Sequence, residues 1–516
     1  MSPQMRPGWL KAIAGLPRSF LKQFVVHFDI PKAGLTTPSG ASFLPSLTLK
    51  EALALTRYRW SQWIFPPRAP SGSPNTASGA LTGTPVRETP SFRPPSLWPS
   101  RLPLPKYPPP PHAEEVPEGL LRVQAIGHGS FLLQTSGLRG SPLRPLSIIT
   151  DPFFSTHAGP WGRVGGSSKQ QHAITASARS SNGNMAFGTL PEGGLLGDYI
   201  IPSSQPSIRR VSQPGVSISF LPSIDIVLLT SPSYDSMDMK TLKELQSAFS
   251  PVIIGPRGTV GPLYLPPKLR GSAYSLQWED EPLKLGGAFF SLLPTAGGAP
   301  SRWGLDKGVG GWGAFCVLLG THQVYVGGAQ GYNPALLAAA AATAQQQRLA
   351  AALNEQEAAV REKYEALWGP LEADDPTPQA KEMATELAAA RHRILAQQPQ
   401  GQHEGVSKAP RDSPGIDLAL LPIGGYEPTQ LLQRFHMTPE EAVEAHRLLG
   451  CRATIASRFD VLPLGAEPFG EAPQRAAAAC VERGVPFNPH AKTQGGPSSK
   501  ADPGFYTLQP GEAIYV

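Results

Sequence analysis

Residues 224–236 read Ile-Asp-Ile-Val-Leu-Leu-Thr-Ser-Pro-Ser-Tyr-Asp-Ser. The apolar run at the start is typical of a fully buried strand, and a helix-like spacing of apolar residues follows over 242–249. Because a buried strand fixes the loop behind it, such loops often carry a protein's chemistry. The loop carries three serines, Ser231, Ser233 and Ser236, and one carboxylate, Asp235.

The rest of the chain alternates between strand-like and helix-like segments. Strands are predicted over 121–126, 131–135, 146–150, 252–256, 289–293, 312–319, 323–326, 416–423, 505–508 and 513–516. Helices are predicted over 334–368, 381–395, 439–446 and 472–483. Strands and helices mixed in this order predict a layered α/β body that starts near residue 118.

Composition narrows the class of protein. The chain has 516 residues, enough for a large core with extensions. Its three cysteines, Cys316, Cys451 and Cys480, form neither a disulfide framework nor a CxxC zinc pattern, which suits a reducing compartment. No apolar run reaches the roughly 20 residues that a membrane-spanning helix needs, so no transmembrane segment is predicted.

The N-terminal region is basic. Residues 1–28 contain no acid, and apolar residues recur there at helical spacing between Lys and Arg, which is typical of a mitochondrial targeting helix. The alternative is a surface helix that docks on the body. A targeting helix at residues 1–28 predicts a mitochondrial location, in the matrix or on the matrix-facing surface of the inner membrane.

Residues 29–117 form a Pro/Ser/Gly-rich extension that cannot pack a core of its own. Thirteen basic and three acidic residues precede His112, a balance of +10 within a net charge of +6. A basic arm of this kind suits RNA or anionic lipid as a partner, and a plain linker is the alternative. Two insertions into the body are predicted, a Gly/Ser-rich one at about 158–207 and a helical hairpin at about 335–412.

Seven sequence blocks in order carry a family resemblance. They are Gly127-His128-Gly129-Ser130, 148–155, 224–235, Trp312-Gly313, Gly331-Tyr332, 421–428 and 436–442. Together they resemble the N-acyl-phosphatidylethanolamine phospholipase D branch of the metallo-β-lactamase superfamily. The resemblance covers 118–516 outside the two insertions, and it implies an αββα sandwich with a two-zinc site and a metal-bound hydroxide that attacks a phosphodiester.

The resemblance also assigns the zinc-ligand positions, which begin with a His-x-His-x-Asp-His loop. In this chain these positions are Ser231, Ser233, Asp235, Ser236, Gly297, Ala329 and Ala456. Zinc is bound by imidazole, carboxylate or thiolate groups, and Asp235 alone among the seven supplies one. We therefore expect no zinc, no cofactor and no catalytic residue, and we expect Asp235 to cap the helix that follows it.

Other residues match positions close to the site or on the substrate side in the family, and they define a candidate ligand pocket: His128, Asp151, Tyr426, Glu427 and His436. His128 and Asp151 are expected to hold turns together. A single-metal site made by His128, Asp151 and Asp235 is an alternative. The last three residues either keep a ligand pocket or brace the loop and helix around them.

Three hypotheses follow. The first is a catalytically inactive homologue that serves as a structural or interaction subunit of a mitochondrial assembly, such as the mitochondrial ribosome or a respiratory complex, with the proteins of that complex as partners. The second is a metal-dependent phospholipase D or related phosphodiesterase with an unrecognised ligand set. The third is a lipid- or nucleotide-binding protein with an inert pocket.

Overall fold

The computed structural model describes residues 98–99, 101–102, 107–137, 143–159, 208–298, 302, 306, 309–369, 377–396, 415–491 and 500–516. The predicted targeting helix over 1–28, most of the Pro-rich extension and nearly all of the 158–207 insertion lie outside these residues. The described end of the extension lies on the body. There, the Trp98 indole N–H donates to the Glu467 carbonyl at 2.8 Å, and the Gln134 amide donates to the Pro111 carbonyl at 2.6 Å.

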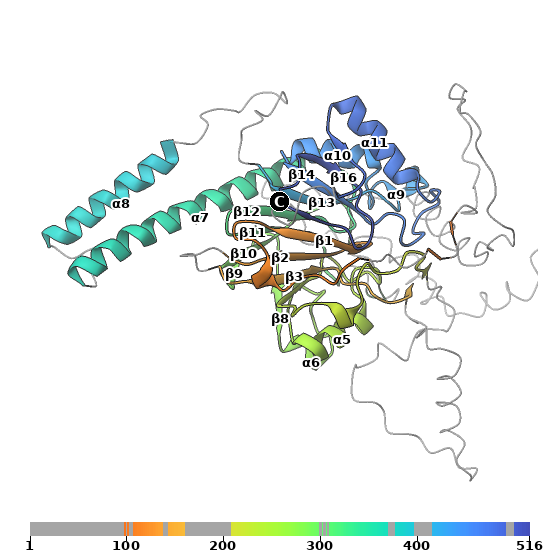
Figure 1. Ribbon diagram of the computed structural model, residues 1–516, viewed down its shortest axis with the longest axis horizontal. Helices are drawn as coiled ribbons and strands as arrows, with labels where there is room; N and C mark the ends of the chain where they lie inside the picture. The colour runs from red at the N-terminus through yellow and green to blue at the C-terminus, as the bar shows by residue number, and fades with distance from the viewer. Residues whose placement is uncertain are drawn as a thin grey trace, which may run out of the picture.

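Two sheets lie face to face in the described part of the chain (Figure 1). The first has the order β17 (Ala513–Tyr515), β1 (Arg122–Gly127), β2 (Ser130–Thr135), β3 (Leu146–Thr150), β6 (Ile226–Leu228), β7 (Val252–Pro256) and β8 (Ala273–Leu276). The second has the order β15 (Phe487–Asn488), β16 (Gly504–Tyr506), β14 (Ala453–Ser457), β13 (Leu418–Pro422), β12 (His322–Val326), β11 (Ala314–Leu319), β10 (Ala288–Leu293) and β9 (Leu283–Leu285). One apolar cluster draws residues from both sheets, so the main core lies between them.

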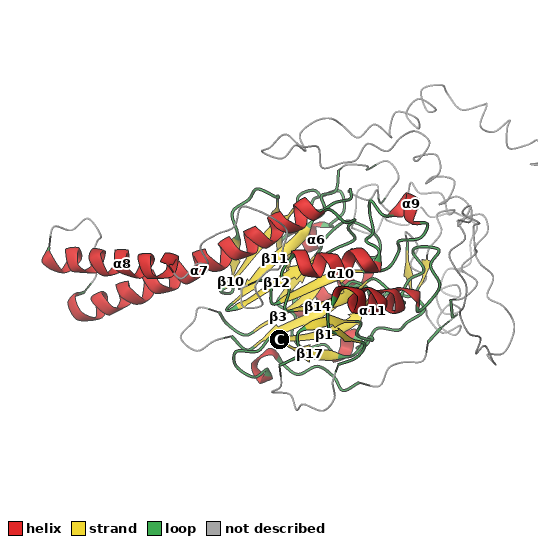
Figure 2. Ribbon diagram, turned by 90° about the horizontal axis from the view of Figure 1, so that it is seen from above, coloured by secondary structure: helices red, strands yellow, loops and turns green. Residues whose placement is uncertain are grey.

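Helices cover the two outer faces, which makes four layers (Figures 1 and 2). Helix α5 (Met239–Phe249) and α6 (Pro267–Arg270) pack on the first sheet, and α10 (Pro439–Leu448), α11 (Glu471–Arg483) and the start of α7 (Pro334–Trp368) pack on the second. The body also contains the short helices η1 (Ala113–Glu115), η2 (Ile218–Phe220) and α9 (Thr429–Leu432) and the two-stranded ribbon of β4 (His157–Ala158) with β5 (Ile208–Arg209). The predicted αββα sandwich is confirmed.

The helical insertion is a hairpin of α7 and α8 (Pro378–Ala396) that stands out from the body in both views (Figures 1 and 2). Asn333 begins α7, where its side chain accepts the N–H groups of Ala335 and Leu336, and Pro334 suits the first turn. The first part of α7 packs on the body. The far part packs on α8 through a separate apolar cluster. None of the described helices combines the length and apolar character needed to cross a membrane.

Strand directions decide where the site lies. β3, β6 and β7 run parallel in the first sheet, and β12, β13 and β14 run parallel in the second. Parallel strands place their carboxyl ends at one edge of a sheet, and loops at that edge carry the functional groups in many α/β proteins. The segments after β3 and β6 of the first sheet meet the segment after β14 of the second sheet at this side of the sandwich.

Candidate functional site

The loop after β6 holds the three serines in a ring of hydroxyls. Ser231 Oγ lies 3.0 Å from Ser233 Oγ, and both hydroxyls donate to Ser236 Oγ, at 3.3 Å and 2.9 Å. Ser231 and Ser236 are buried and Ser233 is half-buried. The serine hydroxyls therefore serve as hydrogen-bond partners for one another.

Asp235 pairs with an arginine from the far end of the chain. The Arg458 guanidinium donates through Nη1 to Asp235 Oδ2, and His128 Nε2 lies 2.8 Å from the same oxygen. The expectation that Asp235 caps the next helix is wrong, because α5 begins at Met239 and its N-cap is Asp238, whose side chain accepts the Lys240 N–H at 3.2 Å. Arg458 was not a candidate from the sequence, although a charged residue directly after the buried strand β14 requires a partner.

Asp151, at the end of β3, receives the other side of the same guanidinium. Arg458 Nη2 donates to Asp151 Oδ2 at 2.6 Å and to Ser236 Oγ at 2.6 Å. Thr230 also donates to Asp151, from its backbone N–H at 2.8 Å and its hydroxyl at 2.6 Å. Burial raises the pKa of Asp151, and Arg458 and Thr230 act against this rise. The carboxylate thus ties together the ends of β3, β6 and β14.

Burial and the Arg458 charge together set the protonation of His128 and Asp235. Burial lowers the pKa of the His128 imidazole to about 4, although Asp235 acts in the opposite direction. Burial also acts to raise the pKa of the Asp235 carboxyl, but Arg458 and His128 outweigh it and hold the pKa well below its ordinary value. The cluster is therefore a neutral imidazole and an ionised Asp235 around one guanidinium.

The backbone of the cluster is strained at three points. His128, Asp151 and Arg458 all adopt left-handed φ angles, of 59°, 34° and 61°. Residues other than glycine adopt this region at a cost, and such residues gather where the surrounding structure fixes them for a purpose. The Arg458 N–H also donates to the His128 carbonyl at 3.0 Å, so main chain and side chain both join these segments.

The remaining assigned positions surround this loop. A Cβ built on Gly328 would come 2.4 Å from Thr230 Oγ1, so the segment carrying Ala329 touches the end of β6. A β-bridge between Ala296 and Gly331 brings the segment of Gly297 beside it. Ala456 is buried in β14, directly before the strand end that carries Arg458. The structure therefore brings the segments that carry the seven assigned positions next to one another.

A second buried arginine holds the backbone of the serine loop. Arg302 donates through Nη1 to the carbonyls of Pro232 at 2.8 Å and Met237 at 2.9 Å. Its guanidinium carbon lies 4.2 Å from the centre of the Tyr234 ring. The loop is thus fixed by Arg302 on its main chain and by Arg458 on its side chains.

The candidate pocket residues divide into two groups. His128 and Asp151 belong to the Arg458 cluster. Tyr426 is completely buried, and its hydroxyl donates to Glu471 at 3.0 Å. Glu427 accepts the Thr429 N–H at 3.2 Å, and His436 lies beside Gly425. These contacts fit a bracing role for Tyr426 and Glu427.

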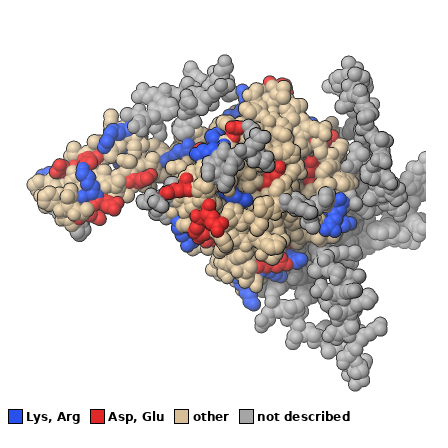
Figure 3. Space-filling model, viewed as in Figure 1, with Lys and Arg blue, Asp and Glu red and all other residues tan. Residues whose placement is uncertain are grey.

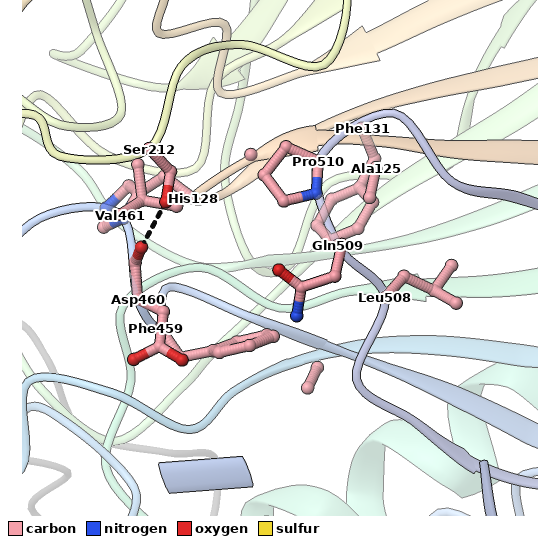
Figure 4. A pocket seen from close by; sticks show the side chains of 12 residues that line it. Ala125, His128, Phe131, Ser212, Phe459, Asp460, Val461, Leu508, Gln509 and Pro510 are labelled. Atoms are coloured by element: carbon pink, nitrogen blue, oxygen red, sulfur yellow. Dashed lines mark hydrogen bonds between the residues drawn. The ribbon is translucent and has the colours of Figure 1, made fainter. Parts of the chain in front are cut away.

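A shallow pocket opens next to His128 (Figure 4). It lies where the turn after β1 meets the segments of Phe459–Val461 and Leu508–Pro510, and Gln509 points into it. Ser212 donates its hydroxyl to the Asp460 carbonyl at 2.5 Å on one wall, and burial raises the pKa of the Asp460 carboxyl to about 6. The space is on the scale of a water molecule rather than a phospholipid headgroup.

The residues present do not fit a zinc pair. Zinc requires three or four imidazole, carboxylate or thiolate donors around each ion. Across the described residues, no group of three or more His, Cys, Asp or Glu side chains is arranged to hold a metal. The single-metal alternative of His128, Asp151 and Asp235 meets a further obstacle, because the positively charged Arg458 guanidinium lies against all three.

The chain is similar in part to one curated enzyme and to several solved structures. No family model matches the chain. It is 39% identical over 54 residues to N-acyl-phosphatidylethanolamine-hydrolyzing phospholipase D 1 of Caenorhabditis elegans, a match that spans 10% of this chain and 15% of that protein. Among solved structures it is similar to Igni18, a metallo hydrolase from Ignicoccus hospitalis, at 14% identity and a TM-score of 0.35, over 77% of this chain and 98% of that one. The metallo-β-lactamase fold protein YhfI of Bacillus subtilis matches at 11% identity and a TM-score of 0.32, over 77% and 100%.

The layers, the two mixed sheets and the loops gathered at the carboxyl ends of parallel strands define the architecture of this chain. It is a mixed α/β protein whose two sheets and outer helices form an αββα sandwich.

Proposed function

We propose that this chain is a non-catalytic protein on the metallo-β-lactamase fold that acts as a structural, protein-binding subunit. The observation that carries the proposal is the serine loop after β6. Its hydroxyls bond to one another, and its single carboxylate is paired with Arg458. A site of this composition offers a metal no ligand set, and it offers a substrate no activated nucleophile.

We propose that this chain is related to the N-acyl-phosphatidylethanolamine phospholipase D branch of the metallo-β-lactamase superfamily. The seven ordered sequence blocks support it, as does the 54-residue match to the Caenorhabditis elegans enzyme. That enzyme's printed name describes hydrolysis of N-acyl-phosphatidylethanolamine. For this chain we propose that the hydrolytic activity is absent and that the sandwich serves as a scaffold.

The additions to the sandwich support a binding role. The α7–α8 hairpin carries charges of both signs, interspersed on the face seen in Figure 3, and Leu367 and Trp368 are 64% and 59% exposed at the end of α7. Large exposed apolar side chains at the end of a projecting element are typical of contacts with another macromolecule. The acid-free residues 1–28 support a mitochondrial location, and the basic extension supports an assembly that contains RNA or anionic lipid.

Two measurements test the proposal: the sedimentation of the chain in mitochondrial extracts and the hydrolytic activity of the purified chain. We expect the full chain, tagged at its C-terminus, to fractionate with mitochondria and to sediment there in a particle far larger than its 54.9 kDa mass. The double variant Leu367→Ser with Trp368→Ser should shift the chain toward the free fraction, whereas Val481→Ser, at an exposed position on α11, should not. Sedimentation of the wild type as a free monomer would contradict the proposal. Zinc-dependent hydrolysis of N-acyl-phosphatidylethanolamine by the purified chain would replace it with a metal-dependent phospholipase.

A further inference from the structure

We propose that the Arg458 guanidinium is the resident cation of this site, joining the two sheets at the point where the metal-ligand positions of the fold converge. This inference concerns the architecture of the site and stands whether or not the chain has a partner. Arg458 lies outside the seven positions assigned from the resemblance, and it is the partner of Asp235 and Asp151 in place of a metal.

The Arg458 guanidinium is buried and is held by several side chains. The Arg458 side chain is 0% exposed, and the Asp151 and Asp235 side chains are 2% and 12% exposed. One amino group of the guanidinium binds Asp235, and the other binds Asp151 and Ser236. Charge-assisted bonds of this kind are the strong class of hydrogen bond, and the planar fork of arginine fixes their directions.

The pairing crosses from one sheet to the other. Asp151 and Asp235 follow β3 and β6 of the first sheet, whereas Arg458 follows β14 of the second. Arg458 and Asp235 are separated by 223 residues in the sequence, and Arg458 and Asp151 by 307. The ion pairs therefore close the sandwich at this edge, as a metal with ligands from both halves would.

The neighbours of Arg458 leave room for its head group. A Cβ built on Gly129 would lie 3.2 Å from Arg458 Nη2, tighter than ordinary contact, so a larger residue there would displace the guanidinium. Ser236 supplies a hydroxyl oxygen that accepts from the same nitrogen. An imidazole in place of Ser236 would occupy part of the space that the Arg458 guanidinium fills. The small serines of the loop therefore leave room for this large cation.

The arrangement of the two carboxylates suits a guanidinium better than a metal ion. The two carboxylates approach different amino groups of a planar cation, and the described residues contain no group spaced to converge on one spherical ion. Two buried carboxylates without a cation would be costly, since a buried charge requires a partner. Arg458 supplies that charge from within the chain.

Charge-compensating variants of the whole chain test the proposal. Arg458→Met should lower the Tm by on the order of 10 °C, because it leaves buried carboxylates uncompensated. Adding Asp235→Asn to Arg458→Met should recover a clear part of that loss, because it removes one of the stranded charges. Arg122→Met is the matched control, because Arg122 is a buried arginine that bonds to Gln124 and Gln134, and its Tm should fall by only a few degrees.

A small cation provides the second measurement. Methylguanidinium at about 10 mM, far below denaturing concentrations, should raise the Tm of Arg458→Ala and leave the wild type and Arg122→Met unchanged. If Arg458→Ala is insoluble, the yield of soluble protein on refolding with methylguanidinium replaces the Tm as the readout. A double variant no more stable than Arg458→Met, a lack of rescue by methylguanidinium, or wild-type protein that retains zinc and loses stability in EDTA would each overturn the proposal.

Discussion

The protonation of His128 gives a quantitative test of the site. The imidazole is buried against Asp235, Arg458 and Arg210, and burial lowers its pKa to about 4. An imidazole beside a carboxylate is often positively charged. Here the Arg458 guanidinium already neutralises Asp235, so the imidazole stays neutral in the folded protein. The unfolded chain, with an ordinary histidine pKa near 6.5, takes up a proton more readily.

The sign and size of the effect follow from linkage. Because the folded pKa lies below the unfolded one, the stabilisation is complete above about pH 6.5 and is lost as the pH falls toward 4. The shift corresponds to a loss of about 2 kcal/mol of unfolding free energy at pH 5 and about 3 kcal/mol below pH 4. Asp460 acts in the opposite direction, since burial raises its pKa to about 6.

Urea unfolding from pH 7.5 to pH 4.5 measures the effect as a difference between the wild type and His128→Gln. Glutamine keeps an N–H near Asp235 but cannot titrate, so the variant should lose about 2 kcal/mol less than the wild type between pH 7 and pH 5. The contribution of Asp460 cancels in this difference. His446→Gln is the positive control, because burial also lowers the pKa of His446 to about 4. Parallel pH profiles for the wild type and His128→Gln would refute the reasoning.

Two further predictions concern local structure. Thr438→Ala removes the hydroxyl that accepts the Glu441 N–H in the capping box of α10, so urea unfolding should show a loss of about 1 kcal/mol that Thr438→Ser largely avoids. Equal stability of the two variants would contradict that role. Gly328→Ala places a Cβ 2.4 Å from Thr230 Oγ1 and should cost about 1–3 kcal/mol. Gly271→Ala, whose nearest contact would be at 3.9 Å, should be nearly neutral, and a similar loss in both would count against the close packing of this loop.

Local patterns predicted most of the fold. The strand over 146–150 and the helix beginning at Pro439 are found where the apolar runs and the capping pattern placed them. β8 and β9 were missed, because they are short edge strands with partly exposed side chains and so lack a strong apolar pattern. The pairing of β17 with β1 joins the two ends of the body, and local periodicity holds no information on such distant pairs.

The sequence assigned a set of positions that lie close together in the structure, but it did not predict the contacts that these positions make. The serine loop, the segments of Gly297 and Ala329 and the strand of Ala456 do meet at one edge. The role expected of Asp235 was wrong because the N-cap of the helix is Asp238, three residues later. A capping role depends on the backbone at the first turn, and helix ends are the least certain part of a sequence-based prediction.

Arg458 was missed for a different physical reason. The zinc-ligand positions concern donor groups alone, whereas a buried site that holds carboxylates also requires a compensating positive charge. Asp151 and Asp235 are both still present, and neither could remain ionised in the interior without compensation. Two buried carboxylates beside small neutral residues therefore predict an arginine or lysine close by, for example directly after a buried strand at the same edge. Arg458, one residue beyond β14, satisfies that condition, and it supplies the positive charge that the buried Asp235 carboxylate requires beside three serines.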